Sequence, residues 1–250
     1  MSNSADLNLK HYYEKYWTEF GVYSRRLGAR TLRILEAHVH LTSHVLEVGC
    51  GTGRAAGGWI TAHCAAYTGV DISENAVTEA RKLGLDARVI QDASELPFAD
   101  SSFDVVLCLE VLEHLFQPFL AAREILRILR PGGVLIVTVP NLTHWQHRLF
   151  FFLGGGWDPS GDSLSRQEPW RDPHIRFFTV GVLNRMLDAA NFSHIHTIGE
   201  EPEQISRIPL IGRLLANPRS AEFLPAFLSH NLVAVAFRRP EHDTHDVIGH

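Results

Sequence analysis

The sequence predicts an α/β fold built around a doubly wound, mostly parallel sheet. From His44 onward, short apolar runs alternate with helical stretches, which is the order of repeated β-α-β units. The apolar runs are continuous rather than alternating, as expected for strands that helices cover on both faces. The first run ends directly in a glycine-rich loop, Gly49 to Gly53, a feature typical of nucleotide-binding α/β proteins.

The individual elements follow from this alternation. Five strands are expected first, at His44–Val48, Ala66–Val70, Ala87–Ile90, Phe103–Leu109 and Val134–Val139. Helices are expected between them, at Arg54–His63, Glu74–Leu83 and Phe119–Leu129. Near the C-terminus we expect a helix over Thr179–Ala190, with Thr179 as its N-cap, and a closing strand pair at Phe192–Ile198 and Leu232–Phe237.

The domain organisation is one α/β domain with additions. Residues 1–43 are expected to form an N-terminal helical segment rich in aromatic side chains, and residues 44–239 the main domain. Two insertions are expected, an irregular one at about 141–173 and one at about 201–229 with helical character around 210–215. The polar, histidine-rich residues 240–250 are expected to be a disordered tail.

Composition restricts the function classes. The 250 residues carry a formal net charge of -5, and no stretch concentrates Lys and Arg, so a nucleic-acid partner is not expected. The three cysteines suit a reduced, cytoplasmic protein. Because no apolar run is long enough to cross a bilayer, only peripheral membrane contact stays open. The oligomeric state does not follow from the sequence.

The glycine loop predicts a binding site for an adenosine-containing ligand. Gly49, Gly51 and Gly53 permit positive φ and close approach of a ligand to the backbone, and a helix starting at Arg54 would direct its N-terminal N–H groups toward that ligand. A dinucleotide fingerprint needs its third glycine one residue later, where Arg54 stands. The Gly-Lys-Ser/Thr ending of a P-loop is absent, so the loop leaves several nucleotide ligands open.

Asp71 is the candidate ribose ligand. It ends the second expected strand about twenty residues after the glycine loop, where an ionised carboxylate can accept hydrogen bonds from ribose hydroxyls. The alternative is that Asp71 caps the helix that starts near Glu74. Ser73 fits that cap position better, which favours the ribose role for Asp71.

Five segments together resemble the class I S-adenosylmethionine-dependent methyltransferases. They are similar to the family's motifs in unbroken order over about residues 44–140: Val45–Gly53, Gly69–Ser73, Gln91–Phe98, Ser102–Leu115 and Leu129–Val137. The segments around Val139–Asn141 and Asp172–Thr179 resemble, more loosely, the type 11 subgroup with the methyltransferases of quinone biosynthesis, and methyltransferase-like proteins linked to methionine biosynthesis.

The resemblance implies a fold, a cofactor and a set of contacts. The fold is Rossmann-like, with a seven-stranded sheet that contains one antiparallel strand, and the cofactor is S-adenosyl-L-methionine, with S-adenosyl-L-homocysteine as its product. The residues that match the family's cofactor contacts are Glu47, Gly49, Cys50, Gly51, Gly53, Asp71, Ile72, Asp92, Ala93, Leu109 and Glu110.

A general base is needed only where the methyl acceptor must lose a proton, as an alcohol or phenol must. His114 after the fourth strand and His144 after the fifth are the candidates, with His174 a third; Glu110 and Glu113 are less suited. His194 and His196 share one face of a strand and could in principle bind a metal, but no third ligand accompanies them. No metal is therefore expected.

The predicted function is methyl transfer from S-adenosylmethionine to a small-molecule or glycan- or lipid-linked acceptor, at oxygen. The N-terminal helix and the two insertions are expected to cover the acceptor. Two alternatives remain open. The first is a methyltransferase-like protein that binds the cofactor and acts with a protein partner, and the second is an NAD-dependent oxidoreductase.

Overall fold

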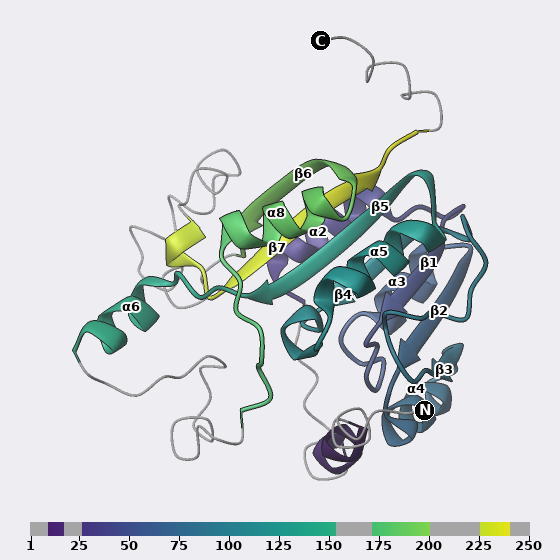
Figure 1. Ribbon diagram of the computed structural model, residues 1–250. Helices are drawn as coiled ribbons and strands as arrows, with labels where there is room; N and C mark the ends of the chain where they lie inside the picture. Colours follow the sequence, from purple (N-terminus) through teal and green to yellow (C-terminus); the bar gives the residue numbers. More distant parts are fainter. Residues whose placement is uncertain (1–9, 18–26, 154–171, 201–225, 241–250) are drawn as a thin grey trace.

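The computed structural model describes residues 10–17, 27–153, 172–200 and 226–240, which form an α/β fold around one seven-stranded sheet (Figure 1). The strands are β1 (His44–Val48), β2 (Ala66–Asp71), β3 (Ala87–Val89), β4 (Phe103–Leu109), β5 (Leu129–Pro140), β6 (Phe192–Gly199) and β7 (Asn231–Arg238). Their spatial order is β3-β2-β1-β4-β5-β7-β6.

Strand directions confirm the expected sheet. β1 pairs in parallel with both β2 and β4, and β4 pairs in parallel with β5. β7 is antiparallel to both of its neighbours, β5 and β6, so it is the single reversed strand. The strand order changes direction between β1 and β4, and in open α/β sheets ligands bind at the carboxyl ends of strands beside such a switch point.

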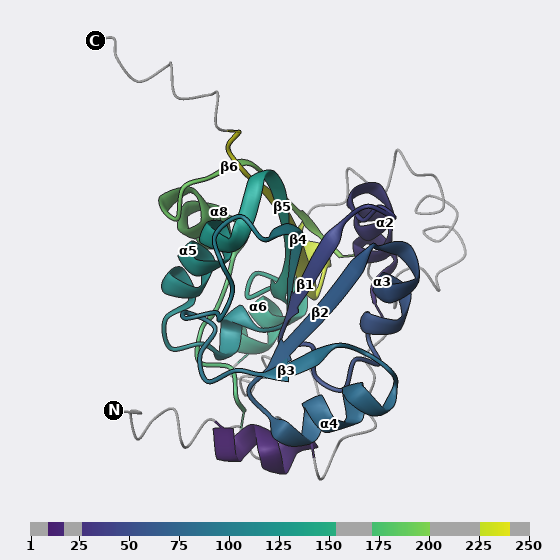
Figure 2. The same cartoon turned by 90° about the vertical axis from the view of Figure 1, so that its right-hand side faces the viewer.

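Helices cover both faces of the sheet (Figure 2). The buried side chains of α2 (Ala29–His38), α3 (Gly57–His63) and α4 (Glu74–Lys82) belong to one apolar core. Those of α5 (Pro118–Ile128) and α8 (Val180–Ala189) belong to the core on the opposite face. Burial on both faces explains why the strands are continuous apolar runs in the sequence.

Two helix starts confirm the expected capping. The Ser73 side chain accepts a hydrogen bond from Ala76 N as the N-cap of α4. Thr179 does the same for Val182 N at the start of α8. These short polar side chains satisfy backbone N–H groups that have no partner inside the helix.

Three expectations about local structure were wrong. α3 begins at Gly57 rather than at Arg54, because residues after the glycine loop form turns first. β5 begins at Leu129, where it pairs with Phe103 before the register shifts. The first insertion is not wholly irregular, because it contains α6 (Trp145–Phe152), which extends away from the sheet (Figure 1).

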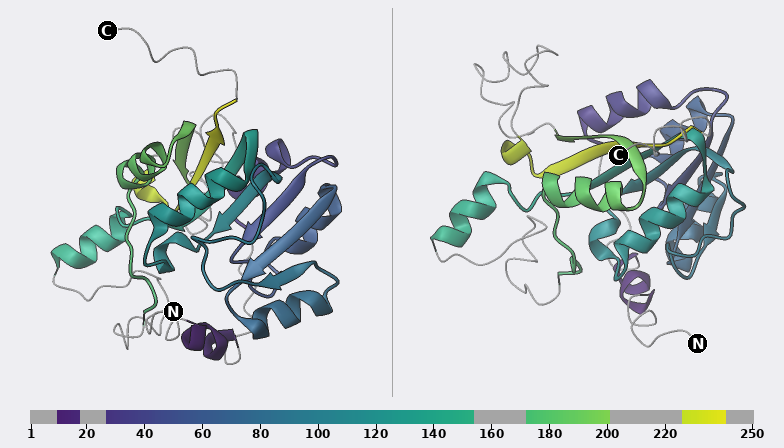
Figure 3. Two further views of the ribbon diagram at one scale, coloured as in Figure 1. Left: turned by 45° about the vertical axis from the view of Figure 1, so that its right-hand side comes forward. Right: turned by 45° about the horizontal axis from the view of Figure 1, so that its top comes forward.

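The N-terminal segment contains a helix over residues 10–17, which lies beside α4 at the lower end of the sheet (Figure 3). The expected helical stretch around 210–215 and the tail after Pro240 lie outside the described residues. The proposed domain boundaries and insertions stay predictions. Among the described helices, none combines the length and the apolar character that crossing a bilayer requires.

Candidate active site

The glycine loop adopts the backbone conformation that its sequence predicts. Gly49, Gly51 and Gly53 have φ angles of 74°, 51° and 72°, a region that other residues rarely enter. A Cβ at Gly49 would clash with Val111, and a Cβ at Gly53 would clash with Leu85. Gly53 therefore has a packing role in addition to the cofactor role predicted for it.

Asp71 joins the glycine loop to the end of β2. Its Oδ2 accepts a hydrogen bond from Gly51 N at 2.8 Å, and its Oδ1 accepts one from Ser73 N at 2.9 Å. Burial raises the pKa of the Asp71 carboxyl, and these backbone hydrogen bonds oppose the rise. The structure thus places Asp71 beside the loop, with Ser73 in the cap role, as the sequence predicts.

Glu47 lies one strand away and is held by a tyrosine. The Tyr67 hydroxyl donates a hydrogen bond of 2.6 Å to Glu47 Oε2. Burial raises the pKa of Glu47 to about 7; the Tyr67 hydrogen bond opposes this shift and the Asp71 charge adds to it. Cys50 is buried beside these groups, and burial raises the pKa of its thiol well above the ordinary value.

The residues expected to contact adenine lie on neighbouring strand ends. Ile72 is half-buried directly after β2, and Ala93 is buried. Asp92 is exposed, and its Oδ1 accepts a hydrogen bond from Ser94 N at 2.8 Å. That bond orders the turn in which Asp92 and Ala93 would read the adenine edge.

The end of β4 has an unusual backbone. Glu110 follows Leu109 with a φ of 58°, a left-handed conformation that costs energy for a residue with a side chain. Its N–H donates to Thr138 O on β5 at 3.0 Å, which helps to hold this turn. Such backbone strain is found disproportionately at binding sites.

The helix of residues 10–17 contributes Glu14, Trp17 and, as described below, Tyr13, none of which the motifs predicted. Glu14 accepts hydrogen bonds from the Ser73 hydroxyl and from Glu74 N and binds the first turn of α4. Trp17 lies against the glycine loop, where a Cβ on Gly51 would be 2.7 Å from its ring. The aromatic run was visible in the sequence, but its expected place was over the acceptor rather than over the loop.

The Tyr13 hydroxyl is a buried polar group that a bound cofactor could satisfy. Its hydroxyl is buried and has no hydrogen-bond partner among the described residues. Burial raises its pKa well above the ordinary value, and the nearby charges of Glu113 and Asp71 add to the shift. A polar ligand between these groups would give the hydroxyl a partner. Together with the glycine cradle and Asp71, this buried group fits a ligand with ribose and amino-acid parts, such as S-adenosylmethionine.

A second group of polar side chains lies next to Tyr13. The Tyr13 ring meets the His114 ring edge-on, with centroids 5.7 Å apart, and His114 stacks on His174 at 4.7 Å. His114 Nε2 is 3.6 Å, and His174 Nε2 3.8 Å, from Glu113 Oε1. On its other side, His174 Nδ1 lies 2.7 Å from Asp172 Oδ1.

Backbone hydrogen bonds hold this group together. Ile175 N and Arg176 N both donate to Glu113 O, at 2.9 and 3.0 Å, so the segment carrying His174 is fixed to the loop after β4. Burial and the nearby His174 lower the pKa of His114 to about 3. His114 is consequently neutral, and a poor proton acceptor, at ordinary pH.

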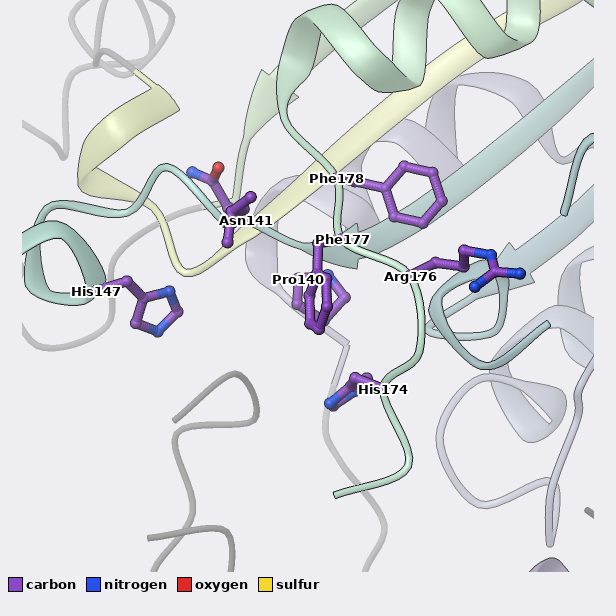
Figure 4. A pocket seen from close by; sticks show the side chains of 8 residues that line it. Pro140, Asn141, His147, His174, Arg176, Phe177 and Phe178 are labelled. Atoms are coloured by element: carbon purple, nitrogen blue, oxygen red, sulfur yellow. The ribbon is translucent and has the colours of Figure 1, made fainter. Parts of the chain in front are cut away.

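His144 and His114 belong to two separate groups of side chains, His144 with His147 and His230, and His114 with Glu113 and His174. His144 is 1% exposed, and its ring lies 3.7 Å, centroid to centroid, from that of His230. A pocket lies between the two histidine groups, lined by Pro140, Asn141, Leu142, His147, His174, Arg176, Phe177 and Phe178. In Figure 4, His147 lies to the left of Pro140 and Phe177, and His174 lies below them.

Comparisons with known proteins show the family of the chain. A family model described as a methyltransferase domain matches residues 46–137. A protein of Encephalitozoon cuniculi that is named a methyltransferase is 32% identical over 148 residues, which are 58% of this chain and 68% of that protein. The 27-O-demethylrifamycin SV methyltransferase of Amycolatopsis mediterranei is 43% identical over 96 residues. That match covers 36% of this chain and only 35% of the relative.

A solved structure supports the fold. A S-adenosylmethionine-dependent methyltransferase of Thermotoga maritima superimposes with a TM-score of 0.60 at 20% identity, covering 92% of this chain and 100% of that one. The family match, the E. cuniculi relative and the sheet topology all agree with the motif resemblance, and they favour it over the nicotinamide-dependent alternative. This chain belongs to the S-adenosylmethionine-dependent methyltransferases of class I fold.

Proposed function

We propose that this protein transfers a methyl group from S-adenosylmethionine to a hydroxyl oxygen of a small molecule. The observation that carries the choice of oxygen is the Asp172–His174 pair, because His174 lines the pocket while its Nδ1 lies 2.7 Å from the carboxylate. The name of the A. mediterranei relative, which specifies a 27-O position, supports the same choice.

The chain's own residues have two tasks in this reaction. Gly49, Gly51 and Asp71 would hold the cofactor, and Tyr13 would close over it. S-adenosylmethionine supplies an already activated methyl group on its sulfonium. The protein therefore needs mainly to align the acceptor, exclude water and remove the hydroxyl proton.

His174 is the best-placed proton acceptor. Asp172 Oδ1 lies 2.7 Å from His174 Nδ1, although this nitrogen makes no hydrogen bond among the described residues. A small rotation of the ring would direct Nδ1–H at the carboxylate and leave Nε2 to take the proton of the acceptor hydroxyl. His114 lacks such a carboxylate at hydrogen-bonding distance, and burial weakens it as a base. His144 packs among other histidines, so we prefer His174 over both bases favoured by the sequence.

The lining of the pocket suits an acceptor with an apolar part. Four lining residues, Pro140, Leu142, Phe177 and Phe178, are apolar, and the other four, Asn141, His147, His174 and Arg176, are polar. The apolar side chains would contact the body of the acceptor, and the polar ones would orient it. Such an acceptor would carry a hydroxyl on an apolar frame, either free or linked to a glycan or lipid.

The test is a transfer assay with methyl-labelled S-adenosylmethionine and paired acceptors that differ only in a hydroxyl or an amine. We expect label on the hydroxyl member of a pair, and loss of transfer in Asp71→Ala and His174→Ala. Label on the amine member alone would contradict the choice of oxygen. Cofactor binding without transfer to any acceptor would instead favour the alternative that acts through a protein partner.

A further inference from the structure

Three histidines from two separate segments meet beside the pocket. His144 is the N-cap residue of α6, His147 follows in its first turn, and His230 precedes β7. One ring nitrogen from each lies within 4.8 Å of the others. The ring centroids of His144 and His147 are 5.4 Å apart, and those of His147 and His230 are 6.1 Å apart.

A buried asparagine fixes the two segments relative to each other. Asn141 is 0% exposed, and its Nδ2 donates to Ala226 O at 2.7 Å and to Ser229 O at 2.8 Å. Its backbone N–H donates to His230 O at 2.7 Å, and its carbonyl accepts from His144 N at 3.1 Å. The histidine-bearing backbones are thus joined by hydrogen bonds, as a preformed site requires.

The His144 ring has the environment of a metal ligand. One of its nitrogens is engaged by the backbone of Leu228, while Nδ1 is buried without a hydrogen-bond partner among the described residues. A metal-binding imidazole typically donates its other N–H to a backbone carbonyl or a carboxylate in this way. A buried polar atom without a partner is costly, and a metal ion at Nδ1 would remove that cost. Packing of three imidazoles as an ordinary polar core is the alternative, but it gives no partner to His144 Nδ1.

We propose that His144, His147 and His230 bind one divalent transition-metal ion of the zinc type. Imidazole nitrogen suits Zn²⁺, Cu²⁺ and Ni²⁺, whereas Mg²⁺ and Ca²⁺ prefer oxygen ligands. Zn–N bonds of about 2.0–2.1 Å in a tetrahedral site place the ligand nitrogens about 3.4 Å from one another. The three nitrogens now lie within 4.8 Å of one another, so each pair must approach by at most about 1.5 Å. Because His147 also lines the pocket, the ion would lie at the pocket's edge. The site does not depend on the proposed acceptor chemistry.

The experiment is metal binding to the untagged, full-length chain after treatment with a chelator. Calorimetric titration with Zn²⁺ alone, and the visible absorption of bound Co²⁺, measure affinity, stoichiometry and geometry. We expect one tight Zn²⁺ per chain, no comparable binding of Mg²⁺, and a higher Tm with Zn²⁺. In His147→Ala and in His230→Ala, the affinity should fall at least about 100-fold and the rise in Tm should disappear.

Three matched variants locate the ion. His44→Ala removes an exposed histidine far from the cluster, and the triple change of His242, His245 and His250 to Gln removes the tail histidines. A double variant, His114→Gln with His174→Gln, tests the Glu113–His114–His174 group, whose ligand atoms are equally close together. All three should keep the tight Zn²⁺. Loss of Zn²⁺ in any of them, unchanged binding in His147→Ala and His230→Ala, or no tight binding to the parent chain would overturn the proposal.

Discussion

His174 Nδ1 lies 2.7 Å from Asp172 Oδ1, and the same oxygen accepts the backbone N–H of His174 at 2.8 Å. The carboxylate therefore fixes the backbone of the histidine that lines the pocket, whereas the ring nitrogen Nδ1 is close to it but makes no hydrogen bond among the described residues. A rotation of the ring that directs Nδ1–H at Asp172 would give the pair in which a carboxylate fixes the tautomer of a general base.

Replacement of His174 should separate proton removal from cofactor binding. We expect His174→Ala to lower kcat by about 100- to 10,000-fold with a hydroxyl acceptor, the usual contribution of a general base. Asp172→Asn should lower kcat in the same direction. Steady-state kinetics, with S-adenosylmethionine affinity measured separately, provides the check. A kcat within threefold of wild type in His174→Ala would assign proton removal to another group.

Loss of the Asp71 carboxylate should weaken cofactor binding. We expect Asp71→Ala to reduce S-adenosylmethionine affinity by about 1–3 kcal/mol, through loss of charge-assisted hydrogen bonds. Calorimetry is the measurement, and Asp188→Ala, on the exposed face of α8, is the matched control. Since Asp71 also accepts from Gly51 N and Ser73 N, a thermal melt must show that the variant is folded. Unchanged affinity in a folded variant would remove Asp71 from the ribose site.

Glu47 should make stability depend on pH. Its pKa rises from 4.5 to about 7, chiefly through burial, so the folded protein keeps a proton that the unfolded chain has lost between these values. The free energy of unfolding should therefore fall by roughly 3 kcal/mol as the pH rises from about 4.5 to about 7. Gln cannot ionise and can still accept the Tyr67 hydroxyl. Glu47→Gln should accordingly be more stable than wild type at pH 8 and close to it at pH 4.5.

Chemical denaturation at several pH values tests this expectation. Glu36→Gln, on an exposed position of α2, controls for the loss of one negative charge. A Glu47→Gln variant with the same pH dependence as wild type would show that Glu47 ionises normally in the folded protein.

Glu14 should hold the N-terminal helix over the cofactor site. Its carboxylate accepts hydrogen bonds from Glu74 N at 2.7 Å and from Asn75 N at 3.2 Å. Although burial raises the pKa of Glu14, these hydrogen bonds and the one from Ser73 outweigh it and lower the pKa. In Glu14→Ala we expect faster hydrogen exchange in residues 10–17 and at the start of α4. His11→Ala, an exposed position on the same helix, should exchange like wild type, and equal exchange in both variants would contradict the capping role.

The sheet was predictable because its signals are local. Strands β1 and β4 have the bounds expected from continuous apolar runs, and Ser73 and Thr179 cap helices as their residue types predict. The start of α3 was not predictable in this way, because three positive-φ glycines and the turns after them delay the helix to Gly57. The helix propensities of the individual residues do not predict this later start.

The candidate site was predictable only where motifs are contiguous. The proximity of Asp71 to Gly49 and Gly51 was predictable, because these residues follow or end two strands whose carboxyl ends lie at the same edge of a parallel sheet. The roles of Glu14 and Trp17 depend on how a helix some thirty residues upstream folds back over the loop. The three-histidine cluster joins positions more than eighty residues apart through Asn141, a contact that no spacing rule encodes.

The most direct test of the account is the fate of a deuterated methyl group on S-adenosylmethionine, followed by mass spectrometry of the acceptor. We expect the label on an acceptor oxygen. We also expect His174→Ala to bind the cofactor and to transfer the label at least about 100-fold more slowly than wild type. Label on nitrogen or carbon, or undiminished transfer by His174→Ala, would contradict the account.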